Sequence, residues 1–276
     1  MNIMIVFMLL HYGDHKVTMD CIESIKGLRY SCEHSILIID NDASPSPWEC
    51  SGIEVVKTGN VGFSEANNIG YKYAKEQMGA TMVVAGNNDL LFDAEGFKED
   101  VLLSYETREV HVVSPDVVKV GTGEHQSPIG TVLRSVEEVR KTIRLNRLVL
   151  SLYPLAYPFM KKYLKGATQI GESVPGYTED VVPCGACIVF TKKYIDAELK
   201  LFYPETKFYY EEYILAKRCR NSGYKIVYDP SLRVGHIDAA SSVATGGGEY
   251  RRIRLKMQRI VESAGVYLNY NRDQSS

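Results

Sequence analysis

The chain lacks the excess of basic residues that proteins binding nucleic acids usually carry. Its 276 residues include 32 lysines and arginines against 34 aspartates and glutamates, which leaves a net charge of −2. Long runs of like charge are absent as well. Because association with polyanions depends on clustered positive charge, these absences argue against nucleic acid as a partner.

Long apolar runs are also missing, although a membrane-spanning helix needs about 20 apolar residues in succession. Residues 1–10 are apolar but have neither a basic region nor a cleavage site, so we predict a first strand rather than a signal peptide. The longest remaining candidate, residues 148–164, is interrupted by two prolines and a lysine pair. We expect it either to lie on a membrane surface or to cover a groove.

The six cysteines are irregularly spaced, and the C-x-x-C formed by Cys184 and Cys187 has no second metal-binding pair beside it. Because the surrounding residues form an apolar strand, we interpret both thiols as small buried side chains rather than a redox pair or half a zinc site. Irregular spacing favours reduced thiols in a cytoplasmic protein. The signatures G-x-G-x-x-G and G-x-x-x-x-G-K-[ST] are absent, so neither a Rossmann cofactor nor a P-loop has direct support.

What the sequence does contain is an alternation of short apolar segments and amphipathic segments. Strands are predicted at residues 3–10, 34–42, 52–60 and 81–89, and helices at 15–28 and 62–79. This alternation is typical of an α/β fold in which a mostly parallel, Rossmann-like central sheet is flanked by helices.

The second half of the chain is less regular. Residues 121–180 show no clean period and predict an irregular insertion. A strand within 181–195, a helix at 210–223 and a strand at 224–236 follow, and then a glycine-rich hinge and a basic helix. We therefore expect an α/β domain over residues 1–245, with the insertion at about 121–180, and a C-terminal helical tail over 246–276.

Polar side chains stand where two of the predicted strands end. Asp40 closes one strand, and Asn87, Asn88 and Asp89 follow another. Ligands of parallel sheets bind beyond the carboxyl ends of the strands. A carboxylate there suits Mg²⁺ or Mn²⁺ shared with phosphate oxygens, and Asp40 suits a base or ribose. Turns and helix caps favour the same residue types, so both interpretations are open at this point.

Two further residues are candidates for chemistry. Glu212 begins a predicted helix and shares a face with the apolar residues Leu215 and Cys219. An inward carboxylate at a helix start is suited to act as a general base, although acidic residues also stabilise first helical turns without any other role. His236 ends the last predicted strand, where a metal ligand and a packed histidine are both open.

Taken in order, these segments resemble the family 2 glycosyltransferases, which have the GT-A fold. The resemblance extends from about residue 4 to residue 236. It rests on IIDNDAS (38–44), NVGFSEANNIG (60–70), Asn87-Asn88-Asp89 in place of a D-x-D metal motif, CGAC (184–187), and the acidic pair Glu211-Glu212 followed by RCRNSGYKIVYDPSLRVGH (218–236).

The resemblance implies a role for each matching residue. At the nucleotide-sugar it places Asp40, Asn68, Asn87, Asn88 and Gly185. As ligands of a divalent metal, Mg²⁺ or Mn²⁺, it implies Asp89 and His236. The general base is Glu212 or its neighbour Glu211; the family usually has Glu-Asp at this pair, so the assignment between the two is open.

The function implied by the resemblance is that of an inverting hexosyl- or deoxyhexosyltransferase, similar to bacterial polysaccharide-assembly enzymes that include rhamnosyltransferases. The expected donor is a dTDP- or UDP-sugar, and the expected acceptor is a saccharide or a lipid-linked glycan. We expect a cytoplasmic protein. Two interpretations are open for residues 144–165 and 251–259: peripheral contact with the inner face of the plasma membrane, or an acceptor-site lid with a solvated helix face.

Two alternatives compete with this interpretation. One is a non-catalytic, degenerate member of the family that binds a glycan or acts as a scaffold. The other is a sugar nucleotidyltransferase, which usually has a Gly-rich, basic loop after its first strand. That loop has no counterpart in LLHYGDHKVT (9–18), so the nucleotidyltransferase is the weaker of the two.

Overall fold

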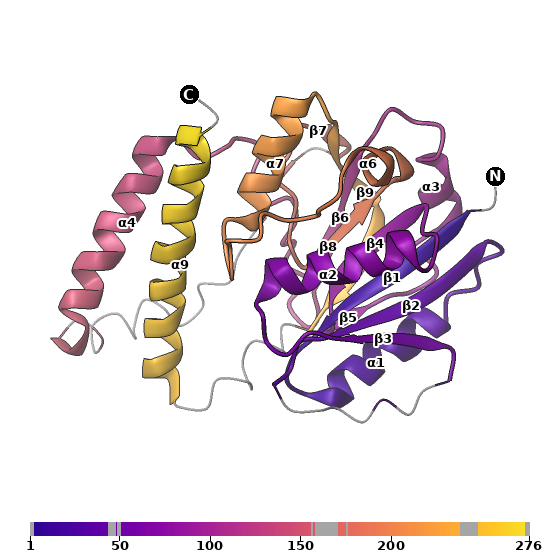
Figure 1. The fold of residues 1–276 in the computed structure, drawn as a ribbon, viewed down its shortest axis with the longest axis horizontal. Coiled ribbons are helices and arrows are strands. Elements are labelled where there is room, and N and C mark those ends of the chain that lie inside the picture. The colour runs from indigo at the N-terminus through magenta and orange to yellow at the C-terminus, as the bar shows by residue number, and fades with distance from the viewer. Residues whose placement is uncertain are drawn as a thin grey trace.

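The computed structural model describes residues 3–43, 48, 51–155, 157, 171–174, 176–237 and 248–273 (Figure 1). In chain order the elements are β1 (Met4–His11), α1 (His15–Lys26), β2 (Glu33–Asp40), β3 (Ile53–Lys57), α2 (Phe63–Glu76), β4 (Met82–Asn87), β5 (Leu90–Leu91), α3 (Glu99–Ser104), β6 (Val112–Lys119), α4 (Val136–Ser151), β7 (Thr178–Glu179), β8 (Cys187–Phe190), α6 (Lys192–Ala197), α7 (Glu211–Ser222), β9 (Ile226–His236) and α9 (Gly248–Asp273).

The first half of the chain folds as the sequence predicts. Its strands lie in the order β3-β2-β1-β4, and each neighbouring pair is parallel. In this register His11 lies opposite Asp40 and Leu10 lies opposite Asn87. The ends of β1, β2 and β4 therefore meet at one edge of the sheet. The predicted α/β architecture with flanking helices is confirmed.

The second half adds antiparallel strands to this sheet. Strand β8 lies between β4 and β6 and is antiparallel to both, whereas β6 and β9 are parallel. The short strands β5 and β7 both pair antiparallel with β9. The described residues thus form one mixed sheet of nine strands. Only Asn88 and Asp89 separate β4 from β5, so the chain crosses the carboxyl edge of the sheet at these two residues.

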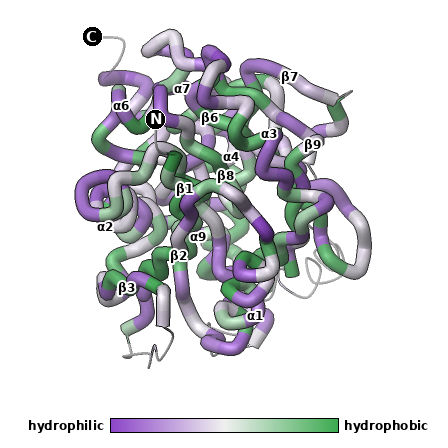
Figure 2. The backbone as a smooth tube through the Cα atoms, turned by 90° about the vertical axis from the view of Figure 1, so that its right-hand side faces the viewer, coloured by the Kyte–Doolittle hydropathy of each residue, from purple (hydrophilic) through white to green (hydrophobic). Residues whose placement is uncertain are grey.

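The core fills both faces of the sheet because successive strand residues point to opposite sides. In β1, Ile5 and Phe7 pack on the face covered by α1, and Val6 and Met8 pack on the face covered by α2. Figure 2 shows hydrophobic residues concentrated along these strands. A Cβ atom at Gly70 would collide with Ile39, so α2 approaches the sheet as closely as it does because residue 70 is glycine.

Helices α4, α7 and α9 form a third group, and Figure 1 shows α4 and α9 side by side at the left. Their shared core includes Val139 and Ile143 of α4, Ile214 of α7 and Tyr267 of α9. The Tyr267 hydroxyl also donates to the backbone oxygen of Arg134, which ties α9 to the start of α4.

Helix α4 lies within the stretch 121–180, for which the sequence shows no clean period. It has 16 residues and begins with a capping box, in which Ser135 and Glu138 satisfy each other's backbone N–H groups. The expected domain boundary at residue 245 lies outside the described residues. Of the helices that the structure describes, none combines the length and the apolar character needed to cross a membrane.

Candidate active site

Asp89 and His236 lie together at the carboxyl edge of the sheet. The pairing of β5 with β9 sets Leu90 opposite His236, which brings the preceding residue, Asp89, beside the imidazole ring. The Asp89 Oδ1 atom lies 3.2 Å from His236 Nε2, and both residues are buried. Two residues that the sequence separates widely, and that were both expected to bind metal, are thus neighbours.

Gln126 orients the histidine. His236 Nδ1 makes a 2.6 Å hydrogen bond with Gln126 Oε1, while the Gln126 backbone N–H donates to the oxygen of Val117 in β6. With Nδ1 as the donor, the other ring nitrogen faces Asp89. Histidines that ligate metals usually donate their second ring N–H to a neighbouring oxygen in this way. No motif marks Gln126, and sequence analysis missed it.

The Asp89–His236 pair offers a carboxylate oxygen and an imidazole nitrogen to a cation. Within the described ranges, no three His, Cys, Asp or Glu side chains come together in a metal-binding cluster. Mg²⁺ typically takes one or two protein carboxylates and completes its coordination with water and substrate phosphates. The pair therefore fits a divalent ion that is bound jointly with a diphosphate, and it does not fit a closed structural metal site.

The two asparagines before Asp89 have different surroundings. Asn88 is buried, and its Nδ2 donates a 2.7 Å hydrogen bond to Thr18 Oγ1, which also bonds His11 Nδ1 at 2.7 Å. Burial lowers the pKa of His11, which keeps this ring neutral. Asn88 thus ties the end of β4 to α1. Asn87 is only half-buried, so its side chain is the more accessible of the two.

Asp40 is buried at the end of β2 and already accepts hydrogen bonds. Its Oδ2 accepts from Trp48 Nε1 at 2.9 Å, and its Oδ1 accepts from the Asp42 backbone N–H at 3.2 Å. The indole ring of Trp48 also lies 4.9 Å from the His11 ring and 4.5 Å from the His15 ring, between centroids. The indole N–H therefore presents to Asp40 the same kind of donor that a uracil or thymine N–H presents.

Asn68 holds the segment that leads to α7. Its Oδ1 accepts from the backbone N–H groups of Leu201 and Phe202, both at 3.0 Å, and its Nδ2 donates to the Phe202 oxygen at 2.9 Å. Both ends of the amide are used within the protein. Asn68 is therefore a positioning residue between α2 and residues 201–202, and this arrangement differs from the sugar contact that the resemblance implies.

Gly185 connects the sheet edge to the acidic pair of α7. The Asn87 backbone N–H donates to the Ala186 oxygen at 2.9 Å, which sets residues 185 and 186 beside the end of β4. The Gly185 N–H donates to the Glu212 carboxylate, and a Cβ atom at Gly185 would collide with Glu212 Oε1. Asn87 and Glu212 are therefore linked through their contacts with Ala186 and Gly185.

The two carboxyl groups of the acidic pair differ in protonation. Burial raises the pKa of Glu212 to about 7, although its own N–H and that of Gly185 favour the charged form. Burial and the nearby charge of Glu212 raise the pKa of Glu211 well above its ordinary value. No hydrogen-bond partner for Glu211 Oε2 is found among the described residues. Near neutral pH, Glu211 is thus a neutral acid, and Glu212 is poised to accept a proton.

The backbone before this pair is strained. Tyr209 and Tyr210 are both left-handed, with φ of 70° and 66°, a conformation that costs roughly 1–2 kcal/mol for residues with a Cβ atom. Their rings lie beneath cations: the Lys256 Nζ atom is 5.9 Å from the Tyr209 ring centroid, and the Arg134 Cζ atom is 5.6 Å from that of Tyr210. Such strain is typical of functional sites, where the surrounding packing maintains it.

The C-x-x-C segment lies behind this edge. Cys184 and Cys187 are free thiols within the core that packs against α1. Burial raises the pKa of Cys184 to about 12, so the thiol remains protonated at neutral pH and packs as a small apolar side chain.

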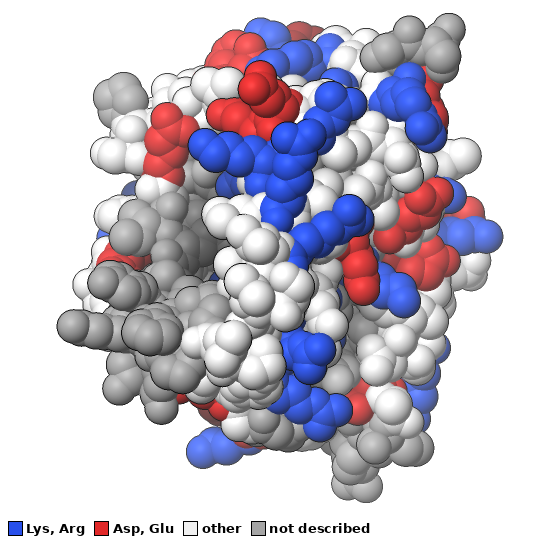
Figure 3. Space-filling model, turned by 90° about the vertical axis from the view of Figure 1, so that its left-hand side faces the viewer, with Lys and Arg blue, Asp and Glu red and all other residues white. Residues whose placement is uncertain are grey.

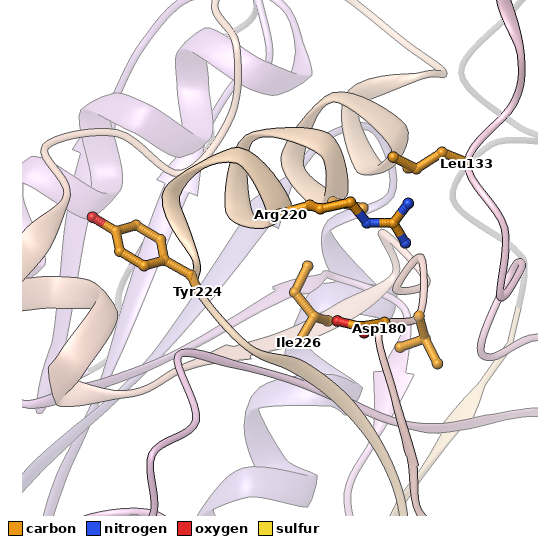
Figure 4. A pocket seen from close by; sticks show the side chains of 7 residues that line it. Leu133, Asp180, Arg220, Tyr224 and Ile226 are labelled. Carbon is orange, nitrogen blue, oxygen red and sulfur yellow. The ribbon is translucent and has the colours of Figure 1, made fainter.

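A shallow pocket lies elsewhere, beside the start of β9 (Figure 4). It is lined by Leu133, Asp180, Val181, Ala216, Arg220, Tyr224 and Ile226. Ile226 and His236 lie opposite Val112 and Lys119 of β6, so seven strand steps, or roughly 23 Å, separate the start of β9 from the Asp89–His236 pair. No candidate residue lines the pocket, and we assign it no part in the chemistry.

The mixed sheet, its flanking helices and the polar carboxyl edge define a fold of the GT-A glycosyltransferase class. A solved structure with this fold is that of GalNAc-T7 with UDP, GalNAc and Mn²⁺. It matches with a TM-score of 0.54 and 14% sequence identity over 88% of this chain and 46% of the GalNAc-T7 chain.

A relative in sequence is the low-salt glycan biosynthesis hexosyltransferase Agl10 of Haloferax volcanii. The two are 27% identical over 124 residues, which make up 41% of this chain and 40% of the Haloferax protein. No family model matches the chain. The similarity thus spans less than half the length of either known protein.

Proposed function

We propose that the protein is an inverting glycosyltransferase of the family 2 type, which transfers a hexose or deoxyhexose from a UDP- or dTDP-sugar to a hydroxyl of a glycan or lipid-linked glycan. One observation carries the proposal: a metal-suited pair, Asp89–His236, and a carboxyl group with a pKa near 7, Glu212, adjoin the same sheet edge. The hexosyltransferase relative supports glycosyl transfer, and the UDP- and Mn²⁺-bound neighbour supports a nucleotide donor with a divalent metal; the inverting course rests on Glu212 alone.

In this proposal Glu212 is the general base and Glu211 is not. The acceptor oxygen forms a bond to C1 of the sugar while its proton passes to the Glu212 carboxylate. The bond between C1 and the phosphate oxygen breaks, and its electron pair leaves with the nucleoside diphosphate. Attack opposite the leaving group inverts the anomeric centre, and a positioned base typically contributes 10²–10⁴-fold to such a step.

Asp89 and His236 would hold a divalent cation, Mg²⁺ or Mn²⁺, at the diphosphate. When bound, this ion supplies positive charge that offsets the negative charge of the leaving group. Asp40 would bind the base in place of Trp48, and Asn87 would face the nucleotide-sugar; Asn88, Asn68 and Gly185 would support the site through the contacts described above.

We place the protein in the cytoplasm, in peripheral contact with the inner face of the plasma membrane, in bacterial surface-polysaccharide synthesis. We further propose that residues 1–245 form the transferase domain, with residues 121–180 inserted and 246–276 as a helical extension. Because α9 shares a buried core with α4 and α7, we expect a protein shortened after residue 245 to lose stability and activity, and full activity would show that the extension is separable from catalysis.

A panel of nucleoside diphosphates and nucleotide-sugars, each with and without Mn²⁺, tests the donor site by thermal shift. At 100 times its Kd, a specific ligand adds about 2.7 kcal/mol of stability. The shift should depend on metal and should be lost in Asp89→Asn, which preserves the size of the side chain. The control Asp20→Asn changes an exposed carboxylate on α1 and should respond like the wild type. If no nucleotide shifts the wild type, the proposal fails and the non-catalytic alternative takes its place.

A further inference from the structure

The outward face of α4 and the residues directly after its end carry leucines that no described residue buries. Leu145 and Leu148 are each 58% exposed, Leu152 is 50% exposed and Leu155 is 73% exposed. Leu145 and Leu148 lie three residues apart in α4 and share one face of the helix, whereas Leu152 caps its end and Leu155 follows three residues later. The opposite face, with Val139 and Ile143, packs against α7 and α9. Helix α4 therefore carries exposed leucines, together with basic residues, on the side opposite its buried face.

Positive charge surrounds this leucine row. Helix α4 contributes four cations after its first turn, Arg140, Lys141, Arg144 and Arg147, and the first half of α9 contributes five, Arg251, Arg252, Arg254, Lys256 and Arg259. Residues 139–155 and 250–261 contain no aspartate or glutamate. Figure 3 shows lysines and arginines in a band across this face, beside uncharged side chains and with acidic residues along its borders. The chain as a whole has a net charge of −2, so the basic residues are segregated here.

Helix α9 also contacts the segment that precedes the acidic pair. The Ser263 hydroxyl of α9 donates a 2.6 Å hydrogen bond to the Phe208 oxygen, and the Arg259 Cζ atom lies 4.1 Å from the centroid of the Phe208 ring. Phe208 precedes the strained tyrosines and the Glu211–Glu212 pair in the chain. The basic helix thus contacts the segment that positions the proposed general base.

We propose that the outward face of α4, with the basic half of α9, is the surface that docks on an anionic lipid bilayer. Leu145, Leu148, Leu152 and Leu155 enter the boundary between headgroups and acyl chains, and the flanking cations rest on anionic headgroups. This surface makes the proposed membrane contact specific, and it rests on the proposed function in that docking here would hold a lipid-linked acceptor near Glu212.

The positive charge of this surface favours an anionic bilayer over a second copy of the chain as its partner. Two copies that meet through this face about a twofold axis would set basic residues against basic residues, since such an interface uses the same patch on both subunits. An anionic bilayer provides the opposite charge together with an apolar interior. Apolar side chains with a rim of cations are the usual composition of helices that lie in membrane interfaces.

Flotation with vesicles tests the proposal without any donor or acceptor. The wild type should bind vesicles of phosphatidylcholine with phosphatidylglycerol, should bind pure phosphatidylcholine weakly, and should lose binding as salt rises. Leu148→Glu with Leu152→Glu should weaken binding roughly tenfold or more per residue. Arg144→Glu with Arg147→Glu should weaken it by roughly 25-fold or more, since each cation contributes a factor of about five.

Matched controls make the test specific. Leu199→Glu alters a leucine that is 77% exposed on the loop after α6, and Arg220→Glu with Lys225→Glu reverses two exposed charges near the start of β9. Both should bind vesicles like the wild type. Asp89→Asn should also bind normally, which separates docking from the transferase proposal.

Two outcomes would overturn the docking proposal. One is that the wild-type protein does not float with anionic vesicles. The other is that the control variants lose as much vesicle binding as the leucine and arginine variants of α4. Concentration-dependent dimers in light scattering that Leu148→Glu converts to monomers would instead identify the face as an interface between copies of the chain.

Discussion

Replacing Glu212 by glutamine should abolish transfer and also make the protein more stable at alkaline pH. Burial raises the pKa of this carboxyl group from 4.5 to about 7. Because the folded state binds the proton more tightly than the unfolded state does, the stability of the wild type falls as pH rises from about 4.5 to about 7. Glutamine has nearly the same shape and cannot ionise, so the variant escapes this loss.

The size of the stability loss follows from the pKa shift of Glu212. At 1.36 kcal/mol per pKa unit, the loss in the wild type is about 3 kcal/mol at pH 8 and only a few tenths of a kcal/mol at about pH 4.5. For a chain of this length, about 3 kcal/mol corresponds to about 5 °C in Tm. Thermal melts of wild type and Glu212→Gln should therefore diverge by this amount at about pH 8 and nearly coincide at about pH 4.5. Transfer rates should fall by about 10²–10⁴-fold.

Glu211→Gln is the matched control for the loss of activity. Burial and the Glu212 charge already keep Glu211 protonated in the folded protein, so glutamine replaces a neutral acid of the same shape. Because the unfolded chain ionises Glu211 at an ordinary pKa, this variant should also melt above the wild type at about pH 8, but unlike Glu212→Gln it should retain most of its activity. The reasoning is refuted if Glu212→Gln transfers sugar at the wild-type rate, or if its melting temperature does not exceed that of the wild type at about pH 8.

The remaining predictions concern the protonation of Glu212, the site of the nucleotide base and the metal site. With Glu212 as the base, kcat/KM should rise about tenfold per pH unit up to about pH 7 and then level off; a profile that is flat from about pH 5 to 8 would contradict this. Trp48, the single tryptophan, should change its fluorescence when UDP or dTDP displaces it from Asp40, and Asp40→Asn should remove the response. Gln126→Leu should raise the Mn²⁺ concentration needed for the nucleotide-dependent thermal shift by about 10–100-fold, because His236 loses the partner that orients it; an unchanged Mn²⁺ titration would exclude this role.

The sequence predicted the first half of the fold well because its signals are local. Buried strands such as β1 are continuous apolar runs, and α2 has a clean helical period that ends near a glycine. Helix α4 was missed because residues 121–180 were interpreted as one irregular stretch, although α4 itself is as amphipathic as α2. Its inner face packs on α9, and its outer face carries exposed leucines among basic side chains.

The residue types alone predicted which chemical groups the candidate site contains. Asp89, His236 and the acidic pair are the groups that a metal and a general base require, and each stands at the end of a predicted strand or the start of a predicted helix. The partners of Asn68 could not be predicted from its residue type. An amide in a motif is equally able to bind a ligand or its own backbone, and only the packing of residues 201–202 against α2 decides between them.

The sequence by itself determined the α/β class, the strand ends that carry polar groups and the order of the motifs, because each depends on neighbours within a few residues. Tertiary structure alone decided that β5 pairs with β9 and so joins Asp89 to His236, that Gly185 meets Glu212, and that leucines of α4 stay exposed among the described residues. Burial sets the pKa of Glu212, and burial is created by residues distant in the chain. The protonation state on which the proposed mechanism depends is therefore a property of the folded protein.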